Sequence, residues 1–236
     1  MAADAIPNRK LFDTHVHTAE VSPCGQVSGG EIARMYKGAG YDGIVITDHL
    51  TSRLSTQFSC RSWSECVASY LSGFRAAQSE GAEIGLTVLW GLELTLDYGP
   101  PGDFLVYGLD EEFLIAHSQL CSLDLPGVRD LIAQADALIV QAHPFRPGHT
   151  LAPTELLDGF EVINGNPRHP YDTSEAFRVA RLHGLLRTAG SDAHRPEDVG
   201  RAGITLPQSP RSIGEFVSML KTGAAEIRSF DPETIA

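Results

Sequence analysis

Two pairs of metal-binding residue types recur at the same spacing near opposite ends of this sequence. His15 and His17 are separated by one residue, as are Asp192 and His194. Side chains two residues apart on an extended segment point the same way, so each pair could share one cation. Taken alone, His15-Val16-His17 fits equally well with one buried and one solvated histidine.

Three further candidate sites lie between these pairs. Asp48-His49 follows a strongly apolar stretch, and Glu93 interrupts another apolar run. A buried, unpaired carboxylate is costly, and a bridge between two cations would remove that cost. His143 ends an apolar stretch and precedes Pro144, so the chain must leave a strand there. The alternatives are an ordinary turn at Asp48 and a half-exposed strand at Glu93.

Short apolar runs alternate with longer amphipathic stretches along the chain. The predicted strands are Lys10–His15, Gly43–Thr47, Thr87–Leu94, Phe104–Gly108, Ala137–Ala142, Phe160–Asn164 and Leu186–Ala189, with Ile204–Leu206 as a further strand. The predicted helices are Gly29–Ala39, Ser64–Glu80, Pro126–Gln134, Thr154–Leu157, Thr173–His183 and Ser212–Thr222. This alternation predicts an α/β fold with a parallel sheet. Seven or eight repeats favour a closed barrel over a doubly wound sheet, formed by residues 1–236 as a single domain.

The candidate residues fall at the ends of the predicted strands. In α/β barrels the C-terminal strand ends build the active site, so the groups around residues 15, 48, 93, 143 and 192 should converge there. Asp103 is an exception, because it stands at the start of its strand. The polar segments 51–61, 145–150 and 165–171 could form the rim of the site, and His149 and His169 are weaker candidates for contacting substrate.

In this order the candidates resemble the PHP family of metal-dependent phosphoesterases, the polymerase and histidinol phosphatase group. The matching motifs are Asp13-Thr14-His15-Val16-His17-Thr18, Ile46-Thr47-Asp48-His49, Gly91-Leu92-Glu93, Ala142-His143-Pro144 and Gly190-Ser191-Asp192-Ala193-His194. The resemblance runs from about Leu11 to the final predicted helix. It implies a distorted, TIM-like (β/α)7 barrel of seven strand–helix units, which agrees with the strand count, and a centre of two or three divalent ions, namely zinc, manganese or iron.

The resemblance also implies a set of ligands. A first ion would be held by His15, His17, Glu93 and Asp192. Glu93 would bridge to a second ion that His143 also holds, and His49 and His194 would hold a third. Two positions depart from the common pattern of the family. Cys24 replaces an aspartate or histidine, which makes it the third-ion ligand and favours zinc or iron over magnesium. Asp103 replaces a histidine, so the second ion would be bound through oxygen.

The implied reaction is hydrolysis of a small phosphate ester or nucleotide. Glu93 would fix the spacing of the ions, and Asp48 would orient His49. His194 is the alternative general acid if the third site is empty. Arg146, three residues after His143, is the best candidate for binding the phosphate. Weaker candidates lie in the same kind of loop: Arg53, Arg168 and Arg195.

Composition restricts the partners and the compartment. The formal charge of −12 argues against extended nucleic-acid binding but leaves a small phosphorylated substrate open. The sequence has no long apolar run, and Met1–Lys10 lacks the apolar core of a signal peptide, so we expect a cytoplasmic protein that is not in a membrane. We expect most of the four cysteines (Cys24, Cys60, Cys66 and Cys121) to be reduced core or surface thiols, with Cys24 as the candidate metal ligand among them.

Two other functions compete with this interpretation. A hydrolase of the amidohydrolase type shares a barrel and an HxH motif, but often bridges two ions with a modified lysine. The only lysines are Lys10, Lys37 and Lys221, and none follows a middle strand. The second alternative is a domain that binds metal but has lost catalytic activity. Assays on phosphate esters, lactones and cyclic amides would separate the three.

Overall fold

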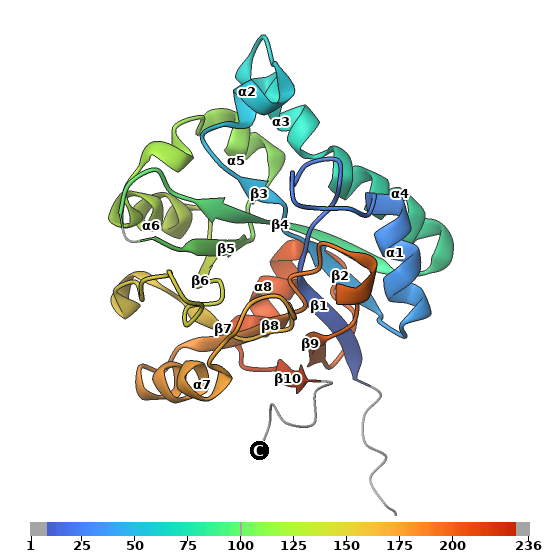
Figure 1. Ribbon diagram of the computed structural model, residues 1–236, viewed down its shortest axis with the longest axis vertical. Helices are drawn as coiled ribbons and strands as arrows, with labels where there is room; N and C mark the ends of the chain where they lie inside the picture. Colours follow the sequence, from blue (N-terminus) through green and yellow to red (C-terminus); the bar gives the residue numbers. More distant parts are fainter. Residues whose placement is uncertain (1–8, 100, 230–236) are drawn as a thin grey trace, which may run out of the picture.

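The computed structural model describes residues 9–99 and 101–229, in which a strongly curved sheet forms a distorted barrel surrounded by helices (Figure 1). The strands are β1 (Lys10–Val16), β2 (Gly43–Ile46), β3 (His49–Leu50), β4 (Thr87–Thr95), β5 (Asp103–Tyr107), β6 (Leu138–Gln141), β7 (Gly159–Asn164), β8 (Leu186–Gly190), β9 (Ala202–Leu206) and β10 (Glu226–Ser229). They pair in the order β10-β9-β1-β2-β4-β5-β6-β7-β8, and β3 pairs with β4. The α/β barrel predicted from the sequence is confirmed.

The barrel closes through the segment that follows β8. Val16 at the end of β1 forms a parallel bridge with Ala193, and the His17 amide donates a hydrogen bond to the Ala193 carbonyl over 3.0 Å. Ala193 lies between Asp192 and His194 in the sequence. Closure therefore brings the two pairs of metal-binding residue types, more than 170 residues apart, to the same edge.

The prediction of a parallel sheet is wrong for part of the barrel. β4 and β5 are antiparallel, as are β5 and β6, while β1 and β9 form a further antiparallel pair. Residues 96–102 between β4 and β5 are too few for the crossover that parallel strands need, so the chain turns back directly. Because β5 runs in reverse, its first residue, Asp103, lies beside the C-terminal ends of its neighbours. The position that looked like an exception is thus at the same edge as the other candidates.

The helices cover the outside of the barrel (Figure 1). They are α1 (Gly29–Gly38), α2 (Leu54–Phe58), α3 (Trp63–Tyr70), α4 (Ser72–Ile84), α5 (Glu111–Ala116), α6 (Leu125–Gln134), α7 (Thr173–Leu182) and α8 (Ile213–Lys221), with 3-10 turns at Leu120–Ser122, Thr154–Leu156 and Pro196–Asp198. Most begin at a serine or aspartate whose side chain accepts a hydrogen bond from an amide in the first turn, such as Ser28, Asp124 and Ser212. These caps fix where each helix starts.

The helix predicted over Ser64–Glu80 is two helices that meet at Leu71. The break lies next to Gly73, where a Cβ atom would come within 1.9 Å of the Thr18 hydroxyl. Only a glycine allows the loop after β1 to approach the helix so closely. The segment 51–61, expected to be a rim loop, contains α2 instead. β3, α5 and β10 are further elements that were not predicted.

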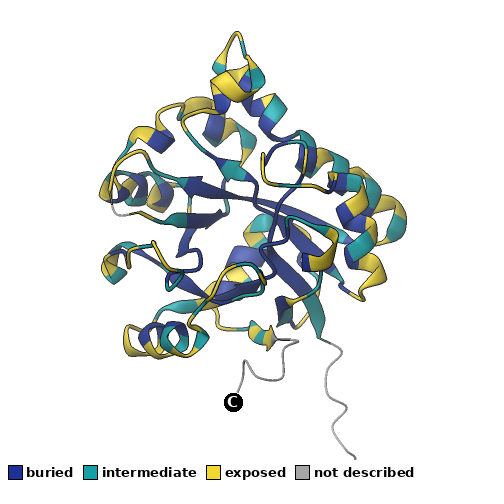
Figure 2. Cartoon of the chain, in the orientation of Figure 1, coloured by how far each residue is buried: buried dark blue, intermediate teal, exposed yellow. Residues whose placement is uncertain are grey.

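Burial follows the barrel, as Figure 2 shows: apart from the edge strand β10, the strands are mostly buried, and the outer faces of the helices are exposed. Cys60 and Cys66 form a disulfide, so the expectation of reduced cysteines is wrong for this pair. Cys24 is free and exposed, and Cys121 is free and buried. Among the described residues, no helix has both the length and the apolar character to cross a membrane. Residues 1–8, most of the segment in which no signal peptide was expected, lie outside the described residues.

Candidate metal centre

The predicted ligands meet in one pocket of about 240 Å³ at the edge where β1, β4, β6 and β8 end. Its lining residues are Cys24, His49, Glu93, Asp103, His143, Arg146, Asn166, Arg168, His169, Asp192, His194 and Arg195. His15 and His17 lie beneath this lining and are fully buried. All nine residues proposed as ligands are therefore at one site. The loops 145–150 and 165–171 contribute to its rim, whereas Arg53, which caps α2, is not in the lining.

Four donor atoms converge at the base of the pocket and define the first-ion group: His15, His17, Glu93 and Asp192. His15 Nε2 and His17 Nε2 are 3.0 Å apart. Glu93 Oε2 lies 3.4 and 3.3 Å from these nitrogens, and Asp192 Oδ1 lies 3.5 and 3.4 Å from them. All four residues are buried.

The tautomer of His15 follows from its outer contact. His15 Nδ1 lies 2.9 Å from Oε1 of Glu161, a fully buried residue of β7. A carboxylate only accepts hydrogen bonds, so Nδ1 carries the proton and donates it to Glu161. In the neutral ring, Nε2 then has no proton and its lone pair faces the other three donor atoms. Glu161 also accepts hydrogen bonds from the His143 amide and the Asn164 side chain.

His17 is oriented in the same way through a serine. His17 Nδ1 is 3.0 Å from Ser22 Oγ, which donates its proton to Asp48 Oδ1 over 2.7 Å. Since that hydroxyl has only one proton, it must accept from His17 Nδ1–H. Nε2 of His17 is therefore also unprotonated in the neutral ring. Asp48, expected to orient His49, instead accepts from Ser22 and Thr18 and so acts on His17.

These contacts leave two lone pairs and two carboxylate oxygens facing one another in a buried space. Such an arrangement is repulsive unless a positive charge lies among them. Tetrahedral ligands at about 2.0–2.1 Å from a central ion lie about 3.3 Å apart. The measured separations, 3.0 to 3.5 Å, match that spacing. Glu93 Oε2 is also buried; its nearest nitrogen, His49 Nδ1, lies 2.8 Å away but outside hydrogen-bonding geometry. The residues present therefore fit a divalent metal ion.

A second set of candidate ligands, the second-ion group, consists of Asp103, His143 and His149. Their donor atoms lie within 4.8 Å of one another. His143 Nε2 is 3.1 Å from Glu93 Oε1, while Glu93 Oε2 belongs to the first-ion group. The two oxygens of Glu93 thus face the two groups separately, as a bridging carboxylate would. His149 lies in the loop after β6, and sequence reasoning considered it only as a residue for contacting substrate.

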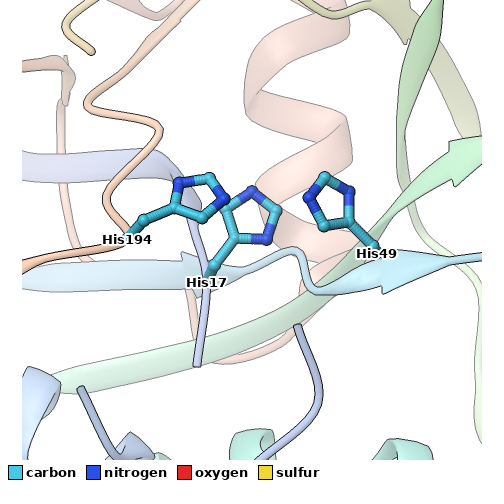
Figure 3. A group of neighbouring side chains, drawn as sticks. All are labelled: His17, His49 and His194. Atoms are coloured by element: carbon cyan, nitrogen blue, oxygen red, sulfur yellow. The ribbon is translucent and has the colours of Figure 1, made fainter. Parts of the chain in front are cut away.

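A third set brings together His17, His49 and His194, which come from three separate segments and turn their rings toward one another (Figure 3). The ring centroid of His17 lies 4.4 Å from that of His49 and 4.2 Å from that of His194. Burial would lower the pKa of His49, but Glu93 and the Cys24 sulfur beside the ring raise it well above its usual value. Cys24 is therefore placed next to the predicted third-ion ligands.

The pKa shifts of the buried groups reflect this mixture of histidines and carboxylates. Burial would raise the pKa values of Glu93 and Asp192, but neighbouring histidines lower both well below their usual range. Burial, followed by the charge of His17, lowers the pKa of His194 to about 3. The His194 ring is then neutral at pH 7, and its Nδ1 lies 2.9 Å from the Asp192 carbonyl, to which it donates. A neutral ring with a free Nε2 suits a metal ligand better than a general acid.

Two of the candidate ligands have strained backbones. Among the described residues only four non-glycine residues have positive φ, and two of them are His143, at 31°, and Asp192, at 51°. Positive φ is uncommon outside glycine, although Asp and His adopt it more readily than most residue types, and it persists where the surrounding structure imposes it. At both positions the chain turns sharply after a strand, which directs the side chain into the pocket.

Arginines form the other side of the pocket. Arg146 donates a hydrogen bond to Asp192 Oδ2 over 2.6 Å, and its Nε is buried with no partner. Arg168 donates two hydrogen bonds to Asp198, a buried residue just after the Asp192–His194 motif. Arg146 is therefore bound to a candidate ligand while its side chain lines the pocket.

Sequence reasoning missed two groups that hold these side chains. Glu161 interrupts an apolar strand in the same way as Glu93 does, so that signal could have found it. Ser22 gave no such signal, because a serine in a loop is ordinary until its partners are known.

Comparisons with known proteins agree with this fold. Residues 170–225 match a family model described as PHP-associated. No curated protein matches the chain. A two-domain protein from Bacteroides vulgatus ATCC 8482, described as containing a predicted PHP-like metal-dependent phosphoesterase, is 20% identical with a TM-score of 0.69, over 97% of this chain and 67% of that one. The PHP resemblance predicted from the sequence is confirmed by the family model and the fold.

Two other solved structures have a similar fold. A proposed metal-dependent phosphoesterase from Bifidobacterium adolescentis ATCC 15703 is 19% identical with a TM-score of 0.54, over 78% of this chain and 88% of that one. An amidohydrolase from Chromobacterium violaceum, solved with sulfate and no metal, is 18% identical with a TM-score of 0.59, over 94% of this chain and 99% of that one. At these identities the likeness establishes the fold, and the function must be argued from the site.

Proposed function

We propose that this protein is a metal-dependent phosphoesterase that hydrolyses a small phosphate ester or nucleotide at a centre of two or three divalent ions. The observation that carries the proposal is the first-ion group. Four buried donor atoms lie at the spacing of a tetrahedral metal site, and the hydrogen bonds to Glu161 and Ser22 turn both histidine lone pairs inward. Zinc, manganese and iron all suit such a mixed histidine and carboxylate set.

The proposed ligands divide among three ions. The first is assigned to the first-ion group, and the second to His143, Asp103 and the bridging Glu93. The third is assigned to His49, His194 and Cys24, whose sulfur lies beside His49. Bound divalent ions supply Lewis-acid chemistry, stabilising charge on phosphoryl oxygens and lowering the pKa of water.

The residues around the ions suit an anionic substrate. Arg146 donates a hydrogen bond to Asp192 and lines the pocket, where its guanidinium can also donate to a phosphate oxygen. Arg168 and Arg195 line the same pocket. A pocket of about 240 Å³ is below the usual volume for a drug-sized ligand, which favours a small ester over a polymer. The net charge of −12 also disfavours extended nucleic-acid binding.

Hydrolysis of a carbon–nitrogen bond or a lactone is the second candidate, because one protein of similar fold is described as an amidohydrolase. None of the chain's three lysines lines the pocket, so a modified lysine cannot bridge the ions there. The arginines give the phosphate ester the better electrostatic match. We place the reaction in the cytoplasm, on a substrate that is not in a membrane.

Replacement of Glu93 by glutamine tests the proposal. The change removes the bridging charge with little change in size, so bound metal should fall and turnover should drop by about a hundredfold or more. The measurements are metal analysis of the purified protein and a screen of phosphate monoesters, diesters, lactones and cyclic amides. Glu65→Gln, on the outer helix α3, is the matched control and should behave like the original protein.

Three outcomes separate the alternatives. Full metal content and full activity in Glu93→Gln would exclude Glu93 as the bridge. Turnover of lactones or amides without turnover of phosphate esters would favour the amidohydrolase alternative. Tight metal binding without turnover of any compound would favour a domain that has lost catalytic activity.

A further inference from the structure

The loop after β6 places His149 beside Asp103 and His143. The ring centroids of His143 and His149 are 4.8 Å apart and the rings are nearly perpendicular, at 81°. Donor atoms of all three residues lie within 4.8 Å of one another. His149 Nδ1 is 4.0 Å from the point where a Cβ of Gly102 would lie, so the ring faces the start of β5.

Ring nitrogens in this group are buried without partners. Neither His143 Nδ1 nor His149 Nδ1 has a hydrogen-bond partner, and the His143 side chain is only 1% exposed. Buried polar atoms are normally paired, and an exception calls for an explanation such as an ion. The first-ion group differs, because its outer nitrogens are both hydrogen-bonded. The protein itself engages neither of these nitrogens, so both remain available to a ligand.

The loop that carries His149 is held firmly. Gln141, buried at the end of β6, donates from its side chain to the Thr150 carbonyl over 2.8 Å and accepts from the Ala152 amide over 3.0 Å. The Thr150 amide also donates to the Pro101 carbonyl over 2.7 Å. These bonds fix the loop next to His149 against both β6 and the segment before β5. His149 is thus positioned by the fold and does not depend on a mobile loop.

Asp103 is oriented in a complementary way. The Thr95 hydroxyl donates to Asp103 Oδ1 over 2.6 Å, which leaves Oδ2 as the oxygen available to a ligand. The PHP resemblance implies a histidine at this position, and a single aspartate oxygen is a weaker partner for zinc or iron than an imidazole. A histidine six residues after His143 can supply the missing nitrogen from a different segment.

We infer that His149 is a ligand of the second ion, together with Asp103, His143 and the bridging Glu93. This inference depends on the proposed function, since it assumes that the pocket holds metal. It assigns to a loop residue of this chain the role that the family pattern gives to the first residue of β5. The nitrogen ligand is in the loop after β6 and not at the start of β5 as in the family pattern. The second site keeps a mixed nitrogen and oxygen ligand set.

The experiment counts ions and does not depend on the substrate. Metal-stripped protein is titrated with Zn²⁺ or Mn²⁺ by calorimetry, and the bound ions are counted by elemental analysis after gel filtration. His149→Ala should lose one ion, or bind it at least about tenfold more weakly, while the first ion stays bound. His149→Phe keeps an aromatic ring beside His143 and should show the same loss. His169→Ala, at another histidine of the pocket lining, should keep the original count.

A relocation variant makes the test sharper. Asp103→His in the His149→Ala background returns the imidazole to the start of β5 and should restore the lost ion. An unchanged ion count and affinity in both His149 variants, with the fold verified by circular dichroism, would overturn this inference alone. If the original protein binds no ion, the proposed function falls with it. Loss of the ion in His169→Ala as well would also contradict a specific role for His149.

Discussion

The first-ion and second-ion groups share Glu93 but are supported very differently. In the first-ion group all four ligands are buried, and the outer atoms of His15, His17 and Asp192 are held by hydrogen bonds to Glu161, Ser22 and Arg146 respectively. In the second-ion group Asp103 and His149 are only half-buried, and two ring nitrogens have no partner.

This difference indicates how firmly each ion should be held. Hydrogen bonds to the outer atoms of ligands fix their orientation and raise metal affinity, typically by ten- to a hundredfold. The first-ion group has these bonds before any ion arrives, so it should bind tightly and keep its ion. The second-ion group is more open, so its ion should exchange more readily. Four experiments can break or sharpen that contrast.

Removal of all the ions should have the largest effect. At a free ion concentration a thousand times its Kd, binding stabilises the folded state by about 4 kcal/mol, and a chelator should abolish that contribution. The measurement is urea unfolding with and without EDTA, followed by re-addition of one equivalent of metal. One equivalent should restore most of the lost free energy of unfolding, because it fills the first-ion group. Recovery only at two or three equivalents would contradict the contrast.

Glu161→Gln should weaken the first ion by about a hundredfold, or about 2.7 kcal/mol. The glutamine keeps the size of the side chain but offers Nδ1 of His15 only a neutral acceptor, so the ring becomes a poorer ligand. Titration of the metal-stripped variant measures the affinity. Glu155→Gln, in the 3-10 turn before β7, is the control. An effect confined to the second ion would show that Glu161 acts mainly through the His143 amide.

Most of the barrel could be predicted from the sequence because its buried strands are short apolar runs. The structure differs from the prediction where the direction of a strand, or its pairing with a neighbour, decides the arrangement. Nothing in the composition of β5 shows that it runs antiparallel, since strand direction depends on the length of the connection and on the neighbours. β3 has only two residues, and β10 is a short strand with two charged residues, so neither has a pattern to detect.

The candidate site also contains residues that could be predicted from the sequence and residues that could not. The histidines were found because two-residue spacing and strand ends are visible in the sequence, as at His15 and His17. Asp103 was named as a ligand only through the family resemblance, because its position relative to the site depends on strand direction. Ser22 and His149 lie in loops, and their roles arise from partners distant in the sequence. Candidates at strand ends can be predicted from spacing, whereas the contacts of residues deeper in loops, such as Ser22 and His149, need the coordinates.

Ser22→Ala should weaken the first ion by about tenfold, or about 1.4 kcal/mol. The hydroxyl links Asp48 to His17, so its loss frees the His17 ring to rotate and leaves Asp48 with one hydrogen bond fewer. The effect should be smaller than that of Glu161→Gln because no charge contacts His17 directly. Calorimetric titration gives the affinity, and Ser69→Ala on α3 is the control. A loss of affinity as large as that of Glu161→Gln would show that His15 and His17 depend equally on their outer hydrogen bonds.

Cys24→Ser should have the smallest effect, because Cys24 is exposed and lies outside both groups. If its thiolate is a ligand of the third ion, serine should reduce zinc binding relative to manganese, since the softer sulfur favours zinc. The first and second ions should keep their affinities within a fewfold. Competition between Zn²⁺ and Mn²⁺, followed by elemental analysis, measures the preference. Cys121→Ser is not a suitable control, because Cys121 is buried. Alkylation of Cys24 with iodoacetamide is the second test, and bound zinc should slow this alkylation. Equal alkylation rates with and without zinc, and an unchanged metal preference, would remove Cys24 from the centre and leave the third ion to histidines alone.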